Sequence, residues 1–226
     1  MLAELREVSK RYVKNEGVRD LTLDIDQGQI VGVLGLNGSG KTTLLKLIAG
    51  LLFPTTGEIN VLGNLPRHNR AKIVFLGETD ALWPWMNPSD GERFMAGLYG
   101  DFHKERYREL LGFLEVPNRR TKAMSRGERG RLRLALALSR DVKLYLLDEP
   151  LAGIDLLSRE RILTSLVREW HTEATILLST HEVAEAEGLF ERVLYLREGR
   201  VALDTSAESL REEGKSVVET FREVLS

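Results

Sequence analysis

A glycine-rich segment at residues 35–42, GLNGSGKT, constrains the fold of this chain more than any other feature. It matches the pattern G-x-x-x-x-G-K-[ST], whose glycines let successive backbone N–H groups and a helix N-terminus point at phosphate oxygens. The pattern requires a strand before it and a helix after it. Ile30–Leu34 is typical of a buried strand, and Thr43–Ala49 of a helix ending near Gly50. The segment therefore predicts a nucleoside triphosphate site in an α/β fold.

Each part of this loop has an expected role. Lys41 should reach the β- and γ-phosphates, and the Thr42 hydroxyl should ligate Mg²⁺. The alternative is a glycine-rich turn that happens to precede a lysine, but a match this complete disfavours it. The predicted nucleotide-binding residues of the loop are Gly35, Leu36, Asn37, Gly38, Ser39, Gly40, Lys41, Thr42 and Thr43.

A second element is the apolar run Leu144–Leu147, which ends in two carboxylates, Asp148 and Glu149. A buried strand with acids at its carboxyl end delivers them to the crevice where α/β sheets bind ligands. Asp148 is the expected Mg²⁺ partner, and Glu149 is expected to orient and polarise the attacking water. Alone, the run could be a strand followed by a solvated turn; the glycine-rich loop favours the functional interpretation.

Composition limits the classes of protein that remain. A chain of 226 residues with 42% hydrophobic content can bury one substantial core, either one large α/β domain or a domain with a subdomain. A formal net charge of −2 gives no reason to expect nucleic acid as a partner. The absence of cysteine excludes disulfides and thiol chemistry. With no apolar signal segment and no apolar run near the roughly 18 residues that cross a bilayer, we expect a cytoplasmic chain.

The pattern along the chain changes twice. The N-terminal part alternates as strands do, the stretch from about 87 to 140 has helical periodicity, and the remainder returns to strands and helices. We therefore predict a single domain over 1–226, with an α/β core from 1–86 and 141–226 and a helical subdomain at 87–140. The expected strands are 5–12, 21–25, 28–34, 58–62, 73–76, 144–147 and 175–179, with a hairpin over 192–203 that turns at Glu198-Gly199 and helices near 158–170 and 182–189.

The C-terminus carries an apolar helical face formed by Val217, Val218, Phe221, Val224 and Leu225. Packing onto the chain's own core is the favoured interpretation, and a subunit contact is the alternative.

A segment just upstream of Leu144 connects the chain to a known family. Met124-Ser125-Arg126-Gly127-Glu128 resembles the signature motif of ATP-binding cassette (ABC) ATPases, usually Leu-Ser-Gly-Gly-Gln. In the family this surface binds the nucleotide held by the opposite subunit, so the resemblance assigns that role to Ser125 and Gly127, at a helix N-terminus that favours an anion. Met124, Arg126 and Glu128 depart from the family pattern.

Other residues resemble family elements in the same order along nearly the whole chain. His181 looks like the switch histidine that contacts the γ-phosphate and Glu149. Leu151–Asp155 resembles the loop that crosses the dimer interface, with Ala152 in place of the usual Ser. Tyr12 resembles the aromatic residue that stacks on adenine, although a core or edge aromatic is the alternative.

The resemblance also assigns Glu78 to the position of the glutamine that senses Mg²⁺ and the attacking water. A carboxylate can bind a metal or water, but its charge alters the metal coupling. Trp83 and Trp85 follow, in a region that meets a cytoplasmic helix of the membrane subunit in transporters of this family. Burial inside the helical subdomain is the alternative for both tryptophans.

The resemblance implies an α/β fold of the P-loop NTPase type: a core with a mixed sheet, an N-terminal antiparallel β subdomain and an inserted helical subdomain. It implies an ATP-hydrolysing subunit, with ATP and Mg²⁺, that powers an ABC membrane transporter, with export as the favoured direction and import as the alternative. Expected partners are a second ABC ATPase subunit, in a homodimer or heterodimer, and an integral membrane permease that holds the chain on the cytoplasmic face of the membrane. A soluble ABC ATPase in iron–sulfur cluster assembly is the alternative; a P-loop kinase or GTPase should lack the Ser125 segment and His181.

Overall fold

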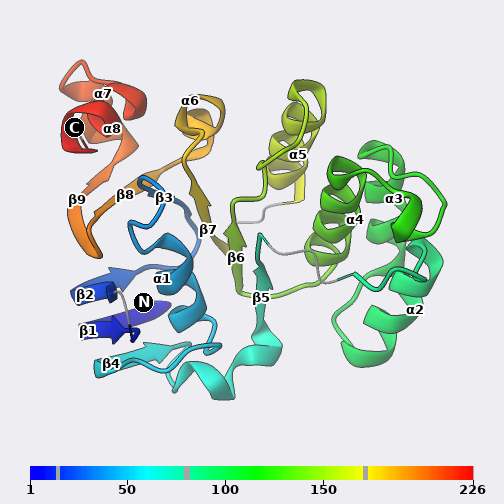
Figure 1. The fold of residues 1–226 in the computed structure, drawn as a ribbon, viewed down its shortest axis with the longest axis horizontal. Helices are drawn as coiled ribbons and strands as arrows, with labels where there is room; N and C mark the ends of the chain where they lie inside the picture. Colours follow the sequence, from blue (N-terminus) through cyan, green and yellow to red (C-terminus); the bar gives the residue numbers. More distant parts are fainter. Residues whose placement is uncertain (14–15, 79–81, 170–172, 226) are drawn as a thin grey trace. The chain divides into compact units, whose positions relative to one another are not determined.

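The computed structural model describes residues 1–13, 16–78, 82–169 and 173–225. The chain forms two compact units (Figure 1). The first contains residues 1–75, 143–149 and 171–226, and the second contains residues 76–142 and 150–170.

The first unit contains an antiparallel sheet of three strands in the order β2-β1-β4. A second sheet has six strands in the order β5-β6-β7-β3-β8-β9. In the second sheet β6, β7, β3 and β8 run parallel, and β9 pairs antiparallel to β8, so this sheet is mixed, as expected. The strands are β1 (Ala3–Arg11), β2 (Glu16–Ile25), β3 (Ile30–Leu34), β4 (Thr56–Val61), β5 (Ile73–Leu76), β6 (Leu144–Asp148), β7 (Thr175–Thr180), β8 (Arg192–Arg197) and β9 (Arg200–Ser206).

Helix α1 (Lys41–Ile48) packs against strands of both sheets (Figure 1). Leu44, Leu45, Leu47 and Ile48 are fully buried, and they join the inward-facing side chains of the two sheets in one apolar core. Because this core fixes the first turn of α1 against the carboxyl end of β3, it also fixes the loop between them.

The first unit also contains further helices. They are η1 (Pro66–His68), η2 (Arg70–Lys72), α6 (Val183–Ala186), η4 (Glu187–Leu189), α7 (Ala207–Glu212) and α8 (Val217–Leu225). The hairpin between β8 and β9 turns at Glu198 and Gly199, both with positive φ, as a tight hairpin turn requires. Strands β4 and β5 follow one another along the chain but belong to different sheets.

The C-terminal helix α8 packs on its own unit. Val217 is buried, and its carbonyl accepts a hydrogen bond of 3.1 Å from the Tyr195 hydroxyl on β8. Burial of this phenol raises the pKa of Tyr195 to about 12. The structure therefore agrees with intramolecular packing for this face; Leu225 ends the helix, and its side chain lies outside the described part.

The second unit is built from helices α2 (Pro88–Leu98), α3 (Lys104–Phe113), η3 (Thr121–Ala123), α4 (Arg126–Leu138) and α5 (Leu156–Glu169). Its bounds differ from the predicted 87–140 for two reasons. The chain before α2 is tied to this unit, because the Thr121 hydroxyl donates to the Trp83 carbonyl at 2.6 Å and Arg133 donates to the Gly77 carbonyl. Helix α5 packs on α4, so residues 150–170 also belong to it. The predicted helix end at Trp170 lies outside the described residues.

Trp83 and Trp85 are exposed, at 44% and 57%, which excludes the alternative that they are buried inside the helical subdomain. Their rings stack with centroids 5.8 Å apart, and Phe94 of α2 meets Trp83 edge-on at 5.0 Å. This cluster is an apolar surface feature of the second unit.

Candidate active site

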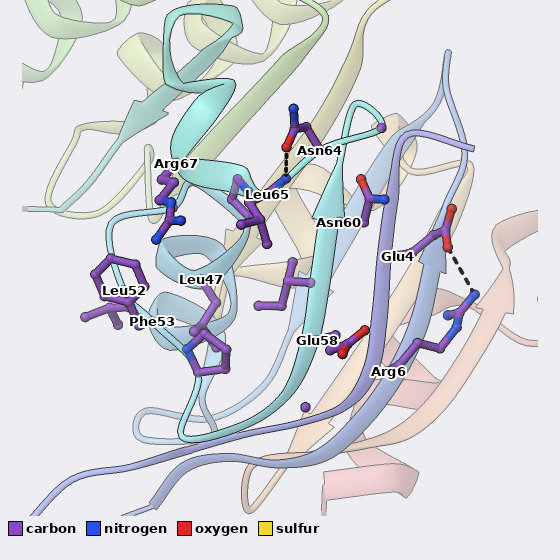
Figure 2. Close-up of a pocket in the computed structure, with 16 residues that line it drawn as sticks. Glu4, Arg6, Leu47, Leu52, Phe53, Glu58, Asn60, Asn64, Leu65 and Arg67 are labelled. Atoms are coloured by element: carbon purple, nitrogen blue, oxygen red, sulfur yellow. Dashed lines mark hydrogen bonds and ion pairs between the residues drawn. The ribbon is translucent and has the colours of Figure 1, made fainter.

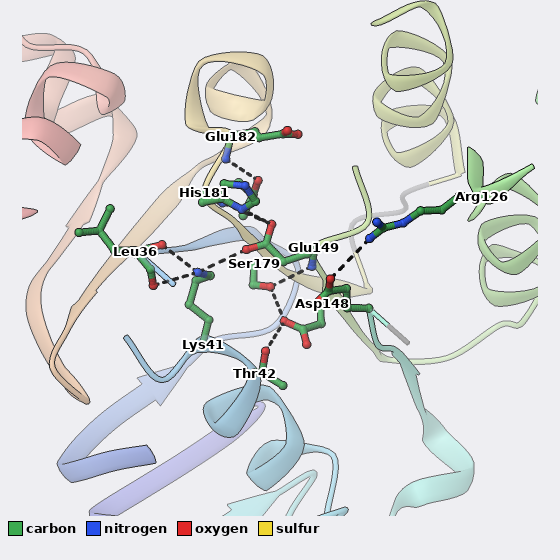
Figure 3. Close-up of polar contacts among 12 residues, drawn as sticks. Leu36, Lys41, Thr42, Arg126, Asp148, Glu149, Ser179, His181 and Glu182 are labelled. Carbon is green, nitrogen blue, oxygen red and sulfur yellow. Dashed lines mark hydrogen bonds and ion pairs between the residues drawn. The ribbon is translucent and has the colours of Figure 1, made fainter. Parts of the chain in front are cut away.

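The glycine-rich loop joins β3 to α1. Gly40 stands at the helix N-terminus with φ 107°, and a Cβ there would lie 2.3 Å from the Gly17 carbonyl oxygen, so only glycine fits. The Lys41 side chain, 6% exposed, bends back over the loop, and its Nζ donates to the carbonyls of Gly35 at 2.8 Å and Leu36 at 3.3 Å. Its ammonium group therefore lies inside the curve of the loop (Figure 3).

The carboxyl end of β6 brings two acids to the same place. Asp148 is 2% exposed, and its Oδ1 accepts hydrogen bonds from the Thr42 hydroxyl at 3.1 Å and the Ser179 hydroxyl at 2.7 Å. β6 and β7 are adjacent and parallel, with Asp148 opposite Ser179, so the sheet register creates this contact. Sequence reasoning missed Ser179; its position at the end of a buried strand was the available signal.

Glu149 leaves the sheet with φ 50°, a left-handed backbone that is uncommon for a residue with a side chain. Its N–H donates to both the carbonyl and the hydroxyl of Ser179, each at 3.1 Å, and these bonds hold the turn. The carboxylate is 11% exposed; Oε1 lies 3.3 Å from Lys41 Nζ and Oε2 lies 2.9 Å from His181 Nδ1. Glu149 is thus fixed between a cation and an imidazole (Figure 3).

The oxygen atoms at the start of α1 and the end of β6 fit Mg²⁺. Mg²⁺ prefers hard oxygen ligands and is commonly held by one or two carboxylates together with substrate phosphates. The Thr42 hydroxyl and the Asp148 carboxylate supply such atoms side by side. Among the described residues, no cluster of three or more His, Asp or Glu side chains forms a metal site, so this metal would depend on phosphate oxygens as well.

Two further features of the first unit fit a nucleotide. Within the described residues, the buried Ser39 hydroxyl has no hydrogen-bond partner, so it can bind a ligand oxygen. Tyr12 is 45% exposed, and its hydroxyl lies 3.3 Å from the Thr43 hydroxyl on α1. The phenol is therefore next to the loop rather than in the core, which excludes the core alternative for Tyr12.

In the second unit, Ser125 caps helix α4. Its hydroxyl accepts a hydrogen bond from the Glu128 N–H at 3.2 Å, and the Glu128 carboxylate accepts one from the Ser125 N–H at 2.7 Å. The Arg119 guanidinium and the Ser125 N–H hold the pKa of Glu128 below its usual range. Glu128, which replaces the family glutamine, therefore stabilises the N-terminus of α4 through these contacts. A Cβ on Gly127 would meet nothing within 4 Å, so the first turn of α4 is open.

The loop that includes Leu151–Asp155 leads into α5. Asp155 Oδ1 accepts a hydrogen bond from the Ser158 N–H at 3.0 Å, and hydrogen bonds from Ser158 hold the pKa of Asp155 below its usual range. Glu78, the predicted metal or water ligand, is 61% exposed and pairs with Arg126 at 3.5 Å.

A separate groove of about 610 Å³ lies in the first unit, next to strand β4. Figure 2 shows Leu47, Leu52, Phe53 and Leu65 on one side of β4 and the charged Glu4, Arg6 and Glu58 on the other. Glu4 pairs with Arg6 at 3.6 Å. The lining charges are balanced, two acidic and two basic with Arg67 included, and none of the lining residues belongs to the predicted nucleotide site.

Among the described residues, none of the helices has both the length and the apolar character needed to cross a bilayer.

Comparisons with known proteins agree with this geometry. Residues 18–152 match the ABC transporter family. The chain is 37% identical over 209 residues to the aliphatic sulfonates import ATP-binding protein SsuB of Escherichia coli (strain K12), covering 90% of this chain and 80% of that protein. It is 36% identical over 204 residues to aliphatic sulfonates import ATP-binding protein SsuB 3 of Pseudomonas savastanoi pv. phaseolicola (strain 1448A / Race 6), covering 88% and 74%.

Solved structures give the same result. An ATP-binding subunit of an ABC transporter superposes with a TM-score of 0.85 at 28% identity, covering 99% of both chains. A dimeric ATP-binding cassette in a post-hydrolysis state, bound to ADP and Pi, has a TM-score of 0.80 at 26% identity, covering 91% of this chain and 98% of that one. These relatives support powered transport, and the two sequence relatives are import proteins, so they do not support the expectation of export. The chain belongs to the ABC transporter family and is one of its ATP-binding, ATP-hydrolysing subunits.

Proposed function

We propose that this chain hydrolyses ATP at the site formed by Lys41, Thr42, Asp148, Glu149 and His181. The observation that carries the proposal is the position of the Glu149 carboxylate, fixed 3.3 Å from the Lys41 ammonium and 2.9 Å from the His181 ring. A carboxylate held in this way can orient and polarise a water molecule for attack on a phosphoryl group.

The other residues of the first unit bind and orient the nucleotide in this proposal. The loop N–H groups and the Lys41 ammonium neutralise phosphate charge, and the Tyr12 ring stacks on the base. Thr42 and Asp148 would hold Mg²⁺, which neutralises charge developing on the phosphates. His181 keeps the Glu149 carboxylate in place through its Nδ1 and can hydrogen-bond a γ-phosphate.

We propose that Ser125 and Gly127 serve the nucleotide bound by a second copy or by a similar subunit. The exposed Ser125 and the open first turn of α4 support this, because a helix N-terminus favours an anion. Glu78 is proposed as a further ligand of the metal or the attacking water. Since each complete site then needs two subunits, ATP should favour the dimer.

We further propose that the subunit powers uptake through a membrane permease, on the cytoplasmic face of the membrane. The support is the identity of 36–37% to ATP-binding proteins of aliphatic sulfonate import, which makes aliphatic sulfonates the first substrates to test. The iron–sulfur assembly alternative has no comparable support.

The test compares E149Q with the double variant E149Q/S125R. E149Q should bind ATP, form a dimer detectable by sedimentation, and hydrolyse ATP at least about 100-fold more slowly, the loss typical of removing a general base. The double variant should bind ATP equally well but remain a monomer. Unchanged turnover in E149Q would remove Glu149 from its role, and dimerisation of the double variant would remove Ser125 from the site of the second subunit.

A further inference from the structure

A close approach between strand β2 and helix α1 depends on Gly17, a buried residue of β2 (Figure 1). A Cβ built on Gly17 would lie 2.7 Å from Thr43 Cγ2, 2.8 Å from Thr43 Oγ1 and 2.8 Å from Tyr12 Cε2. These distances are shorter than the roughly 3.5–4.0 Å at which carbon atoms pack. A glycine inside a strand often marks a place where another part of the molecule approaches closely. Position 17 therefore has no room for a side chain.

The space left by this glycine holds the Tyr12 ring beside α1. The Tyr12 hydroxyl lies 3.3 Å from the Thr43 hydroxyl, and Lys10 Nζ lies over the ring, 5.8 Å from its centroid, within the reach of a cation–π contact. Thr43 thus restrains the hydroxyl end of the ring, Gly17 borders its Cε2 edge, and Lys10 lies over one face. Tyr12 is nevertheless 45% exposed, so the restrained ring keeps surface for a planar partner.

Gly17 also borders the glycine-rich loop. Its carbonyl oxygen is the atom that a Cβ on Gly40 would meet, at the N-terminus of α1. The Tyr12 ring and the loop are therefore both in close contact with the same residue of β2. In a nucleotide the base and the phosphates are covalently joined, so a ring that stacks on the base must be placed correctly relative to the loop that binds the phosphates.

We propose that Gly17 is a positioning residue for the nucleotide base. The absence of a side chain at position 17, together with the Thr43 hydroxyl, holds the Tyr12 ring where a base attached to loop-bound phosphates can stack on it. The inference rests on the proposed stacking role of Tyr12. Aromatic stacking requires a defined offset between the rings, so a displaced Tyr12 ring loses part of it. Gly17 therefore sets how much the base adds to the affinity that the loop provides for phosphate.

The test separates the base from the phosphates by comparing ADP with pyrophosphate. Calorimetric titration of the full chain with each ligand in the presence of Mg²⁺ gives two dissociation constants, and the pyrophosphate constant divided by the ADP constant measures the contribution of the nucleoside. Y12A should lower this ratio by about 5- to 150-fold, the range for stacking of a base on an aromatic side chain. G17A should lower it by about 3-fold or more, because the new Cβ displaces the ring. In the Y12A background G17A should leave the ratio unchanged.

A second variant, T43V, restrains the ring less without adding a clash. Valine keeps the shape of threonine but removes the hydroxyl beside Tyr12, so the ratio should fall by about 2-fold or more. An effect of Thr43 on phosphate binding changes both dissociation constants and cancels in the ratio. If G17A does not fold, T43V decides the question, and an unchanged ratio in T43V then overturns the inference.

G32A is the matched control, because Gly32 is buried in β3 of the same unit and a Cβ on it would lie 2.9 Å from the Phe190 ring. It should destabilise the chain and leave the ratio unchanged. The inference is overturned by an unchanged ratio in G17A, by an equal fall in G32A, or by a further fall when G17A is added to Y12A. If Y12A leaves the ratio unchanged, the proposed stacking of Tyr12 fails; if the unaltered chain binds neither ligand, the proposed nucleotide site fails. These failures are therefore distinguishable from that of Gly17.

Discussion

Replacing Ser179 by alanine tests whether the sheet edge holds the Asp148 carboxylate in its working position. The Ser179 hydroxyl is fully buried and donates to Asp148 Oδ1 at 2.7 Å. A hydrogen bond to a charged group contributes about 1.5–3 kcal/mol to stability. The Glu149 N–H keeps the Ser179 carbonyl as an acceptor, and Asp148 keeps the Thr42 hydroxyl, so no further polar group loses its only partner. We therefore expect S179A to lower the free energy of unfolding by about 1.5–3 kcal/mol.

Urea unfolding followed by circular dichroism measures this loss, and thermal unfolding should show a midpoint lower by about 3–12 °C for a chain of this size. T220V is the control in the same unit: its buried hydroxyl donates to the neutral Ser216 carbonyl within one helix, and it should cost less than about 1 kcal/mol. A second consequence is weaker metal-dependent binding of ATP in S179A. If S179A destabilises the chain no more than T220V, the Ser179 contact does not stabilise Asp148 and this reasoning is refuted.

Two further predictions concern the second unit. Arg119 and the Ser125 N–H hold the folded-state pKa of Glu128 below its ordinary 4.5, so the ionised carboxylate stabilises the fold above pH 4.5. This stabilisation is lost as the pH falls through the folded-state pKa. In urea titrations between about pH 5 and 3, E128Q should therefore lose less stability than the unaltered chain. Arg140, with a side chain 4% exposed, makes two bonds of 2.8 and 2.7 Å to Asp101, so D101A should leave a buried cation and cost about 2–4 kcal/mol in urea unfolding; a cost below about 1 kcal/mol would contradict this account.

Much of the fold was predictable because its signals are local. The loop at 35–42 carries its own glycines and follows an apolar run, and every described residue of that run is buried in β3. The hairpin at Glu198-Gly199 carries its own turn residues, and β8 and β9 pair around it. Such features depend on neighbours in the sequence, so periodicity and turn chemistry suffice.

The features that were not predictable depend on contacts distant in the sequence. Ser179 is a site residue because β6 and β7 are in register, and no local pattern states that register. The pairing of Glu78 with Arg126 spans 48 positions, and hydrophobic periodicity contains no information about it.

The Lys41 ammonium is bound to two loop carbonyls and to Glu149, so it restrains the loop from its inner side. These contacts hold the loop in its curved shape, so little conformational entropy is lost when the loop binds phosphate. The same contacts must be exchanged for phosphate oxygens, which lowers the affinity below the sum of the new bonds. In a loop of this kind the affinity for phosphate is lower, but binding is fast and reversible. A repeating cycle of nucleotide binding and release requires this reversibility.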